Sequence, residues 1–211
     1  MVDVAIVDYG MGNLRSVEQA LRHVAPDADI VVTDDAAVIE QAGRVVFPGQ
    51  GAMPDCMREL DARGLRNAVI DAAQTKPFLG ICIGLQMLFE HSAEGDVPGL
   101  GVLKGEVLRF AGSMHDEQGN KLKVPHMGWN QVRHQVDHPL WSGIAQDARF
   151  YYVHSYYVKP QDQSLIQATS DYPAPFVCAV ARGNLFGVQF HPEKSQAAGL
   201  KLLQNFIHWN P

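Results

Sequence analysis

The stretch Phe78-Leu79-Gly80-Ile81-Cys82-Ile83-Gly84-Leu85-Gln86 joins an apolar run to a helical pattern. A cysteine between two glycines in a strand-to-helix turn has the form of the nucleophile elbow Gly-x-Ser-x-Gly, with sulfur in place of oxygen. A Cβ at either glycine would clash with the adjoining backbone of so sharp a turn. At a helix N-terminus, Cys82 is placed to act as a thiolate beside free backbone N–H groups. The alternative is a buried structural cysteine in a packing turn.

Outward from this turn, the first half of the chain alternates short β-branched runs with helical patterns. The pattern predicts helices at about 13–24 and 55–73, and strands at 2–7, 29–33, 44–47 and 78–81. This alternation is typical of a parallel sheet wound with helices. Because glycine-bearing turns follow three of the strands, we expect these turns at the carboxyl edge of the sheet, where open α/β folds bind ligands.

The second half of the chain changes character. Residues 101–158 read as extended runs with turn signals, including the aromatic run 150–153, and we interpret them as an antiparallel extension of the sheet. A strand at 186–190 and an amphipathic helix at 197–207 follow. The prediction is an α/β fold: an open, mostly parallel twisted sheet of flavodoxin-like type, flanked by helices. Without a linker or repeat, residues 1–211 are expected to form a single domain.

Composition excludes several classes of protein. With 46% hydrophobic residues the chain is too apolar for a disordered protein. The 17 Lys and Arg against 23 Asp and Glu give a net charge of −6, which argues against general nucleic-acid binding. The longest mostly apolar stretch, 78–89, is too short to span a bilayer, and the N-terminus lacks a basic signal region. Three cysteines without a C-x-x-C pair favour a reducing, cytoplasmic location.

Two further segments complete a candidate reaction centre. His191-Pro192-Glu193 follows a predicted strand, so the histidine could act as a base and the glutamate could hold its other ring nitrogen. The turn at 47–51 offers Gly49 and Gly51, whose flexible backbone could donate to an oxyanion. Taken alone, the first segment is also compatible with a surface turn and the second with an ordinary strand-to-helix turn.

These motifs resemble the class I, or triad, glutamine amidotransferases over essentially the whole chain. The elbow through Gln86 and the segment 191–193 carry the general resemblance. Within the family, the chain is most similar to the glutaminase subunits of imidazole glycerol phosphate synthases of histidine biosynthesis. The segments that carry this finer likeness are Asp8-Tyr9-Gly10-Met11-Gly12-Asn13-Leu14, Pro125-His126-Met127-Gly128-Trp129-Asn130, Tyr152-Val153-His154-Ser155-Tyr156 and Phe190-His191-Pro192-Glu193-Lys194-Ser195.

The resemblance implies an enzyme that releases ammonia from glutamine without a metal or other cofactor. Cys82 would be the nucleophile, His191 the acid and base, and Glu193 the residue that orients the histidine. The backbone around Gly49, Gly51 and Ile83 would form the oxyanion hole. Glutamine would be held by Gln86, His154, Ser155 and Tyr156. This chain has Gln50 where many members have a small apolar residue, which leaves the backbone N–H unchanged.

The resemblance also implies a partner, a (β/α)8-barrel cyclase subunit that forms a heterodimer with the glutaminase and receives its ammonia. The residues that would face this partner near the ammonia exit are Asn13, Met127, Trp129, Tyr151 and Lys194. Plain packing is the alternative for Met127 and Trp129, and solvation is the alternative for Lys194. Other class I amidotransferase subunits, a freestanding γ-glutamyl cysteine hydrolase and a silent interaction module are the competing functions.

The cysteines and histidines outside the candidate reaction centre are expected to have structural roles or to lie at the surface. Cys56 and Cys178 are expected to be buried small hydrophobes. The histidines without metal-ligand spacing are expected at the surface or at helix caps, namely His23, His91, His115, His134, His138 and His208. His126 lies inside one of the motif segments, and the sequence assigns it no chemical role.

Overall fold

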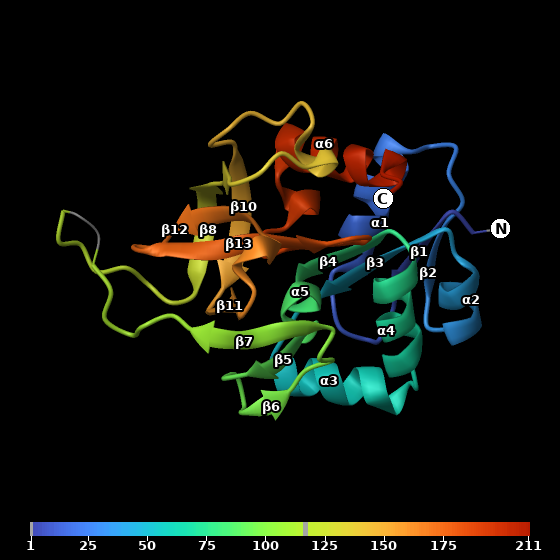
Figure 1. Cartoon of the computed structure of the whole chain (residues 1–211), viewed down its shortest axis with the longest axis horizontal. Coiled ribbons are helices and arrows are strands. Elements are labelled where there is room, and N and C mark those ends of the chain that lie inside the picture. The colour runs from blue at the N-terminus through green and yellow to red at the C-terminus, as the bar shows by residue number, and fades with distance from the viewer. Residues whose placement is uncertain (1, 116–117) are drawn as a thin grey trace.

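Five parallel strands form the centre of the fold in a computed structural model that describes residues 2–115 and 118–211 (Figure 1). Their spatial order, β2-β1-β3-β4-β14, has the flavodoxin-like arrangement. The strands are β1 (Val4–Val7), β2 (Ile30–Thr33), β3 (Arg44–Gly49), β4 (Phe78–Cys82) and β14 (Leu185–Val188). Every residue of β1, β4 and β14 is buried, as expected for parallel strands covered on both faces.

Helices cover both faces of this parallel region. In Figure 1, α1 (Leu14–Val24) and α6 (Gln196–His208) lie above the strands, whereas α3 (Met53–Ala62) and α4 (Arg66–Thr75) lie below them. The short helix α2 (Ala36–Gln41) packs near α4, and α5 (Ile83–Met87) follows β4 directly. No helix within 2–115 or 118–211 has the length and apolar composition needed to cross a membrane.

The sheet continues beyond β14 through antiparallel strands, which confirms the predicted extension. β14 pairs with β13 (Pro175–Arg182), which pairs with β11 (Tyr156–Pro160), which in turn pairs with β7 (Leu103–Arg109). The far edge consists of β5 (Phe89–Ser92), parallel to β7, and β6 (Val97–Pro98). On the other side of β13 lie β12 (Ile166–Asp171) and β9 (Arg133–His134).

The aromatic run 150–153 does not join this extension. It belongs to β10 (Arg149–His154), which pairs with β8 (His126–Gln131) in a separate two-stranded antiparallel sheet. The two strands lie in Figure 1 beside β12 and β13. The alternating pattern of a strand indicates that the strand pairs with another, but it does not identify the partner. The local pattern of residues 150–153 therefore gave no sign of a second sheet.

Two expected boundaries are also wrong. The single helix predicted at 55–73 is divided into α3 and α4, because Gly64 adopts a left-handed φ of 68° and ends the first helix. The strand predicted at 186–190 ends at Val188, and α2 was not predicted. The six residues of α2 are too few for a clear helical period, and they are capped by the Asp35 carboxylate, which accepts from Ala37 N–H at 2.9 Å.

The register of β3, β4 and β14 decides where the carboxyl ends of the strands meet. Gly49 of β3 lies opposite Cys82 of β4, and Val188 of β14 lies opposite Ile81. Three separate turns therefore leave the sheet at the same edge. The short helix η3 (Pro192–Lys194) follows β14 at this edge.

Replacing Gly84 by alanine should destabilise the fold. A Cβ at Gly84 would overlap the backbone carbonyl of Phe47 in β3, where the backbone of the sheet has little room to move. We expect Gly84→Ala to lower the free energy of unfolding by about 1–3 kcal/mol, measured by urea denaturation. Gly112→Ala is the matched control, because a Cβ there meets nothing within 4 Å. Equal stability of the two variants would contradict this expectation.

Candidate active site

Cys82 stands on a sharp turn between β4 and α5. It is the last residue of the strand and precedes the first residue of the helix, with φ 55° and ψ −111°. A non-glycine residue in this left-handed region is held there by its surroundings. A Cβ at Gly80 would lie 3.2 Å from the Gly84 oxygen, so the first glycine of the motif allows the turn to close. The predicted elbow is therefore present.

His191 and Glu193 form a buried pair beside this turn. His191 Nδ1 lies 2.8 Å from Glu193 Oε1, and the two side chains are 7% and 2% exposed. Because the carboxylate only accepts, Nδ1 is the donor. The other ring nitrogen, Nε2, is buried and has no hydrogen-bond partner among the described residues, and Cys82 is close enough to raise the pKa of the ring. The three predicted catalytic residues are brought together.

Two opposing effects set the protonation of His191. Burial lowers the pKa of the imidazole, but negative charge on Cys82 and the carboxylate of Glu193 raise it by more. The net result is a raised pKa, so the imidazolium form is favoured when the sulfur is charged. An imidazolium held beside the Cys82 sulfur by Glu193 is placed to donate a proton to a group that leaves after attack by the sulfur.

A pocket of about 230 Å³ opens over the sulfur. It is smaller than the roughly 300–1,000 Å³ typical of sites for drug-sized molecules, as expected for a small metabolite. The seven residues predicted for the oxyanion and for substrate all line it, together with two of the catalytic residues. Its walls consist of Gly49, Gln50, Gly51, Cys82, Ile83, Gln86, Glu94, Pro125, Val153, His154, Ser155, Tyr156 and His191.

Glu94 is a pocket residue that the sequence analysis missed. It lies in the turn between β5 and β6 and carries the only carboxylate among the lining residues. Its Oε2 accepts from the backbone N–H of Met53 at 2.9 Å, at the first residue of α3. This bond holds the carboxylate at the pocket and leaves Oε1 for a ligand. No local pattern marks the residue, because its position depends on the pairing of β5 with β7.

Gln189 is a second missed residue, and it joins Gln86 to Cys82. Gln86 Nε2 donates to Gln189 Oε1 at 3.0 Å and to the Tyr156 carbonyl at 3.1 Å. Gln189 Nε2 in turn donates to Cys82 Sγ at 3.7 Å. Both glutamines are buried, and Gln86 Oε1 is an acceptor without a partner. The position of Gln189, two residues before His191 in the chain, is the sequence signal that could have identified it.

The ring of His154 is already occupied by protein groups. Its Nδ1 donates to the Tyr156 carbonyl at 2.7 Å, and its Nε2 lies 2.9 Å from His126 Nδ1. Because both nitrogens are used, the predicted contact of His154 with glutamine would have to come from its backbone or a ring carbon. Burial lowers the pKa of His154 to about 3 and that of His126 to about 4, so both rings are neutral.

Four of the five residues predicted to face a partner gather on β8, β10 and η3. Trp129 and Tyr151 are cross-strand partners with ring centroids 5.9 Å apart, and Lys194 Nζ lies 6.0 Å from the Tyr151 ring. Met127 and Trp129 are 61% and 41% exposed. We call Met127, Trp129, Tyr151 and Lys194 the β8–β10 cluster.

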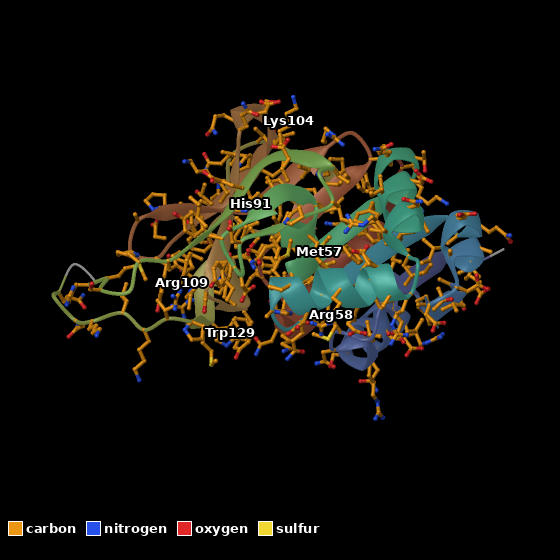
Figure 2. All side chains as sticks on the ribbon, turned by 90° about the horizontal axis from the view of Figure 1, so that it is seen from below. Met57, Arg58, His91, Lys104, Arg109 and Trp129 are labelled. Atoms are coloured by element: carbon orange, nitrogen blue, oxygen red, sulfur yellow. The ribbon has the colours of Figure 1, made fainter. Side chains whose placement is uncertain are left out.

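Two hydrogen bonds connect the β8–β10 cluster to the segment that carries His191 and Ser195. His191 N–H donates to the Tyr151 carbonyl, and Tyr151 N–H donates to Ser195 Oγ, both at 2.9 Å. Figure 2 shows Trp129 at the edge of the molecule opposite Lys104. Asn13, the fifth predicted residue, is exposed in the turn after β1, next to Gly12, which lies against Gly49.

The remaining cysteines and histidines are distributed largely as predicted. Cys56 and Cys178 are buried and free. His23, His91, His115 and His208 are exposed, and His138 Nδ1 caps the short helix η1 (Pro139–Trp141). His134 is instead half-buried and stacks on Trp141. Within the described parts of the chain, no three His, Cys, Asp or Glu side chains are grouped as metal ligands.

Comparison with known proteins identifies the family. The family described as "Glutamine amidotransferase class-I" matches residues 5–209. The chain belongs to the class I glutamine amidotransferases. The family expected from the motifs is thereby confirmed, and the chain is an enzyme of this class.

Relatives of known name support the same assignment. Imidazole glycerol phosphate synthase subunit HisH of Thiobacillus denitrificans is 66% identical over 211 residues, which cover all of this chain and 92% of the relative. The subunit of the same name from Nitrosospira multiformis is 66% identical and is covered completely, as is this chain. A crystal structure of a glutamine amidotransferase has the same fold at 16% identity, with a TM-score of 0.72 and 97% of each chain covered.

His126 and His154, like His138, whose pKa burial also lowers to about 4, should make the stability of this amidotransferase depend on pH. Since free imidazole titrates near pH 6.5, the unfolded chain binds more protons than the native chain between about pH 4 and 6.5. Stability should therefore fall as the pH decreases through this window, by up to about 1.4 kcal/mol per pH unit for each ring. Urea denaturation at several pH values measures this slope. His126→Asn should flatten it, whereas His23→Asn, at an exposed position, should not; equal slopes would contradict the assignment.

Proposed function

We propose that this chain is the glutaminase subunit of an imidazole glycerol phosphate synthase and acts as a single domain over residues 1–211. The observation that carries the proposal is that Cys82 and His191 line a pocket of metabolite size, with the buried Glu193 side chain bonded to His191 behind them. The high identity to subunits of that name supports the choice of this enzyme among the amidotransferases.

The first half of the reaction forms a thioester. The Cys82 sulfur attacks the side-chain carbonyl carbon of glutamine, and a C–S bond forms as the C–O double bond opens. When the oxyanion collapses, the C–N bond breaks and His191 Nε2 gives its proton to the leaving nitrogen, which departs as ammonia. Glu193 holds Nδ1 at 2.8 Å throughout, so Nε2 stays directed at the reacting atoms.

The second half returns the enzyme to its starting state. His191 Nε2 takes a proton from water, the resulting oxygen nucleophile attacks the thioester carbon, and the C–S bond breaks. The products of the cycle are glutamate and ammonia. Backbone N–H groups near Gly51 and Ile83 stabilise the oxyanion in both halves. Gly51 has a φ of 116°, which a residue with a side chain rarely adopts.

Polar groups of the pocket match the two charges at the other end of glutamine. The Glu94 carboxylate pairs with the α-ammonium group. The unpartnered Gln86 Oε1 accepts a hydrogen bond from one N–H of the same ammonium group. Backbone and hydroxyl groups of Ser155 and Tyr156 hold the α-carboxylate. A buried acceptor without a partner costs stability in the free protein, so binding of a donor there is favourable.

The ammonia passes to a partner, a (β/α)8-barrel cyclase subunit, rather than into water. The exposed Met127 and Trp129 side chains and the neighbouring Tyr151 and Lys194 present an apolar and cationic surface next to the catalytic loop. Exposed aromatic side chains of this kind are typical anchors of protein interfaces. The pairing takes place in the cytoplasm, where the three free cysteines stay reduced.

Release of glutamate from glutamine is the decisive measurement. The purified chain alone should be nearly inactive, and addition of a cyclase subunit with its ribotide ligand should stimulate release strongly. Cys82→Ala should abolish release without affecting complex formation, because it removes the sulfur and little core volume. Vigorous release by the chain alone would favour a freestanding γ-glutamyl hydrolase. No release under any condition would favour an interaction module or another acceptor enzyme.

Trp129→Ala should weaken the complex. Truncation of an exposed aromatic anchor at an interface costs about 2 kcal/mol, which corresponds to roughly thirtyfold in Kd. Isothermal titration calorimetry with the cyclase subunit measures the change. Val136→Ala is the matched control, because Val136 is also a large exposed hydrophobic residue, 46% exposed, but lies outside the β8–β10 cluster. Unchanged affinity of the Trp129 variant would show that this side chain is merely packed on the surface.

A further inference from the structure

We propose that His126 is a positioning residue for the glutaminase reaction, because it begins a buried chain of hydrogen bonds that ends at the sulfur of Cys82. The inference rests on the proposed function for its kinetic consequence but not for its geometry. His126 itself does not line the pocket, and the catalytic steps above do not use it. Its influence passes through His154, the Tyr156 carbonyl and the two buried glutamines.

The chain of bonds is continuous. Asn130 Nδ2 lies 3.3 Å from His126 Nε2, and His126 Nδ1 lies 2.9 Å from His154 Nε2. His154 Nδ1 lies 2.7 Å from the Tyr156 carbonyl oxygen, which also accepts from Gln86 Nε2. The links from Gln86 through the second glutamine to the sulfur complete the path.

Both ends of the histidine segment impose the same direction on it. The Tyr156 carbonyl can only accept, so His154 must be protonated at Nδ1 and must accept at Nε2. Asn130 Oδ1 accepts from the backbone N–H of Gln131 at 2.8 Å, so the Asn130 atom facing His126 is the donor Nδ2. His126 therefore accepts at Nε2 and donates from Nδ1. Two independent constraints agree on one tautomer for each ring.

The amide segment has a fixed direction for the same reason. Gln86 must turn its nitrogen to the Tyr156 carbonyl, and this nitrogen also donates to Gln189 Oε1. Gln189 can then present only its nitrogen to Cys82. The orientation also leaves Gln86 Oε1 unpartnered. Reversing any one ring tautomer or side-chain amide in this chain of hydrogen bonds would place two like groups, donors or acceptors, opposite each other, or would turn an acceptor toward the sulfur.

The surroundings of His126 hold its ring in place. The ring stacks on Tyr172, with centroids 4.0 Å apart, and on Tyr152, at 4.8 Å, with interplanar angles of 28° and 27°. His126 is 4% exposed and does not line the pocket, so water has little access to its hydrogen bonds. Burial also lowers the pKa of His126 and of His154, which keeps both rings neutral as the chain of bonds requires.

Two substitutions at His126 separate positioning from packing. His126→Phe keeps an aromatic ring between the two tyrosines but removes the donor to His154. His126→Asn loses the ring but keeps a donor, since its amide nitrogen is bonded to Cγ as Nδ1 is in histidine. A packing role predicts that Phe is tolerated better than Asn. The positioning role predicts the opposite order.

The experiment measures glutamate release in the complex with the cyclase subunit, at a temperature where circular dichroism shows all variants folded. We expect His126→Phe to lower kcat/KM by about tenfold, the loss that corresponds to one buried hydrogen bond, and His126→Asn to stay within about threefold of the wild type. Full activity of the Phe variant, or a greater loss in the Asn variant, would overturn the inference. If the wild type released no glutamate, the proposed function would fail instead.

Two measurements do not depend on glutamine turnover. The rate of Cys82 alkylation by iodoacetamide should fall in His126→Phe and recover in His126→Asn, with Cys82→Ala as the background. Nitrogen NMR of the wild-type chain should show both rings neutral and protonated at Nδ1, with a coupling across the bond between His126 Nδ1 and His154 Nε2. An Nε2 proton or a charged ring would overturn the inference even if no Phe variant folds.

Discussion

The parallel register of β3, β4 and β14 is the constraint on which the site depends. Their backbone hydrogen bonds place Gly49 opposite Cys82 and Val188 opposite Ile81. The turns that carry Gly49, Cys82 and His191 leave the sheet at this one edge, so these residues meet although they lie far apart in the sequence. A shift of one residue in the pairing of β3 with β4, or of β4 with β14, would turn the side chains of a whole strand to the opposite face of the sheet. The residues of the site would then no longer meet.

Burial lowers the pKa of two histidines that line the same pocket, but the net shift has opposite signs in the two rings. It lowers the pKa of His154, which is surrounded by aromatic rings and neutral dipoles. It also lowers the pKa of His191, but the charges of Cys82 and Glu193 reverse the result. Groups whose environments separate their pKa values in this way take different roles. In the proposed reaction His191 transfers protons, whereas His154 is a neutral link between His126 and the Tyr156 carbonyl.

Local sequence patterns predicted those parts of the site whose residues all lie within one turn. The glycines around Cys82 are one such signal, and the placement of His191 and Glu193 on either side of a single proline is another. Both are recognisable because sharp turns restrict which residues fit. Glu94 and the pairing of β8 with β10 could not be predicted in this way, since both depend on contacts between segments far apart in the chain. The histidine without an assigned role, His126, became interpretable only when the structure placed it beside His154.

The left-handed backbone at Cys82 has an evolutionary consequence. Any residue with a side chain is strained by roughly 1–3 kcal/mol in such a conformation, whereas glycine is not. One base change converts a cysteine codon into a glycine codon. Selection for stability alone would therefore drive this position toward glycine, and only selection for chemistry opposes it. With Cys82 as the proposed nucleophile, loss of selection on ammonia production would leave a subunit without its nucleophile one mutational step away.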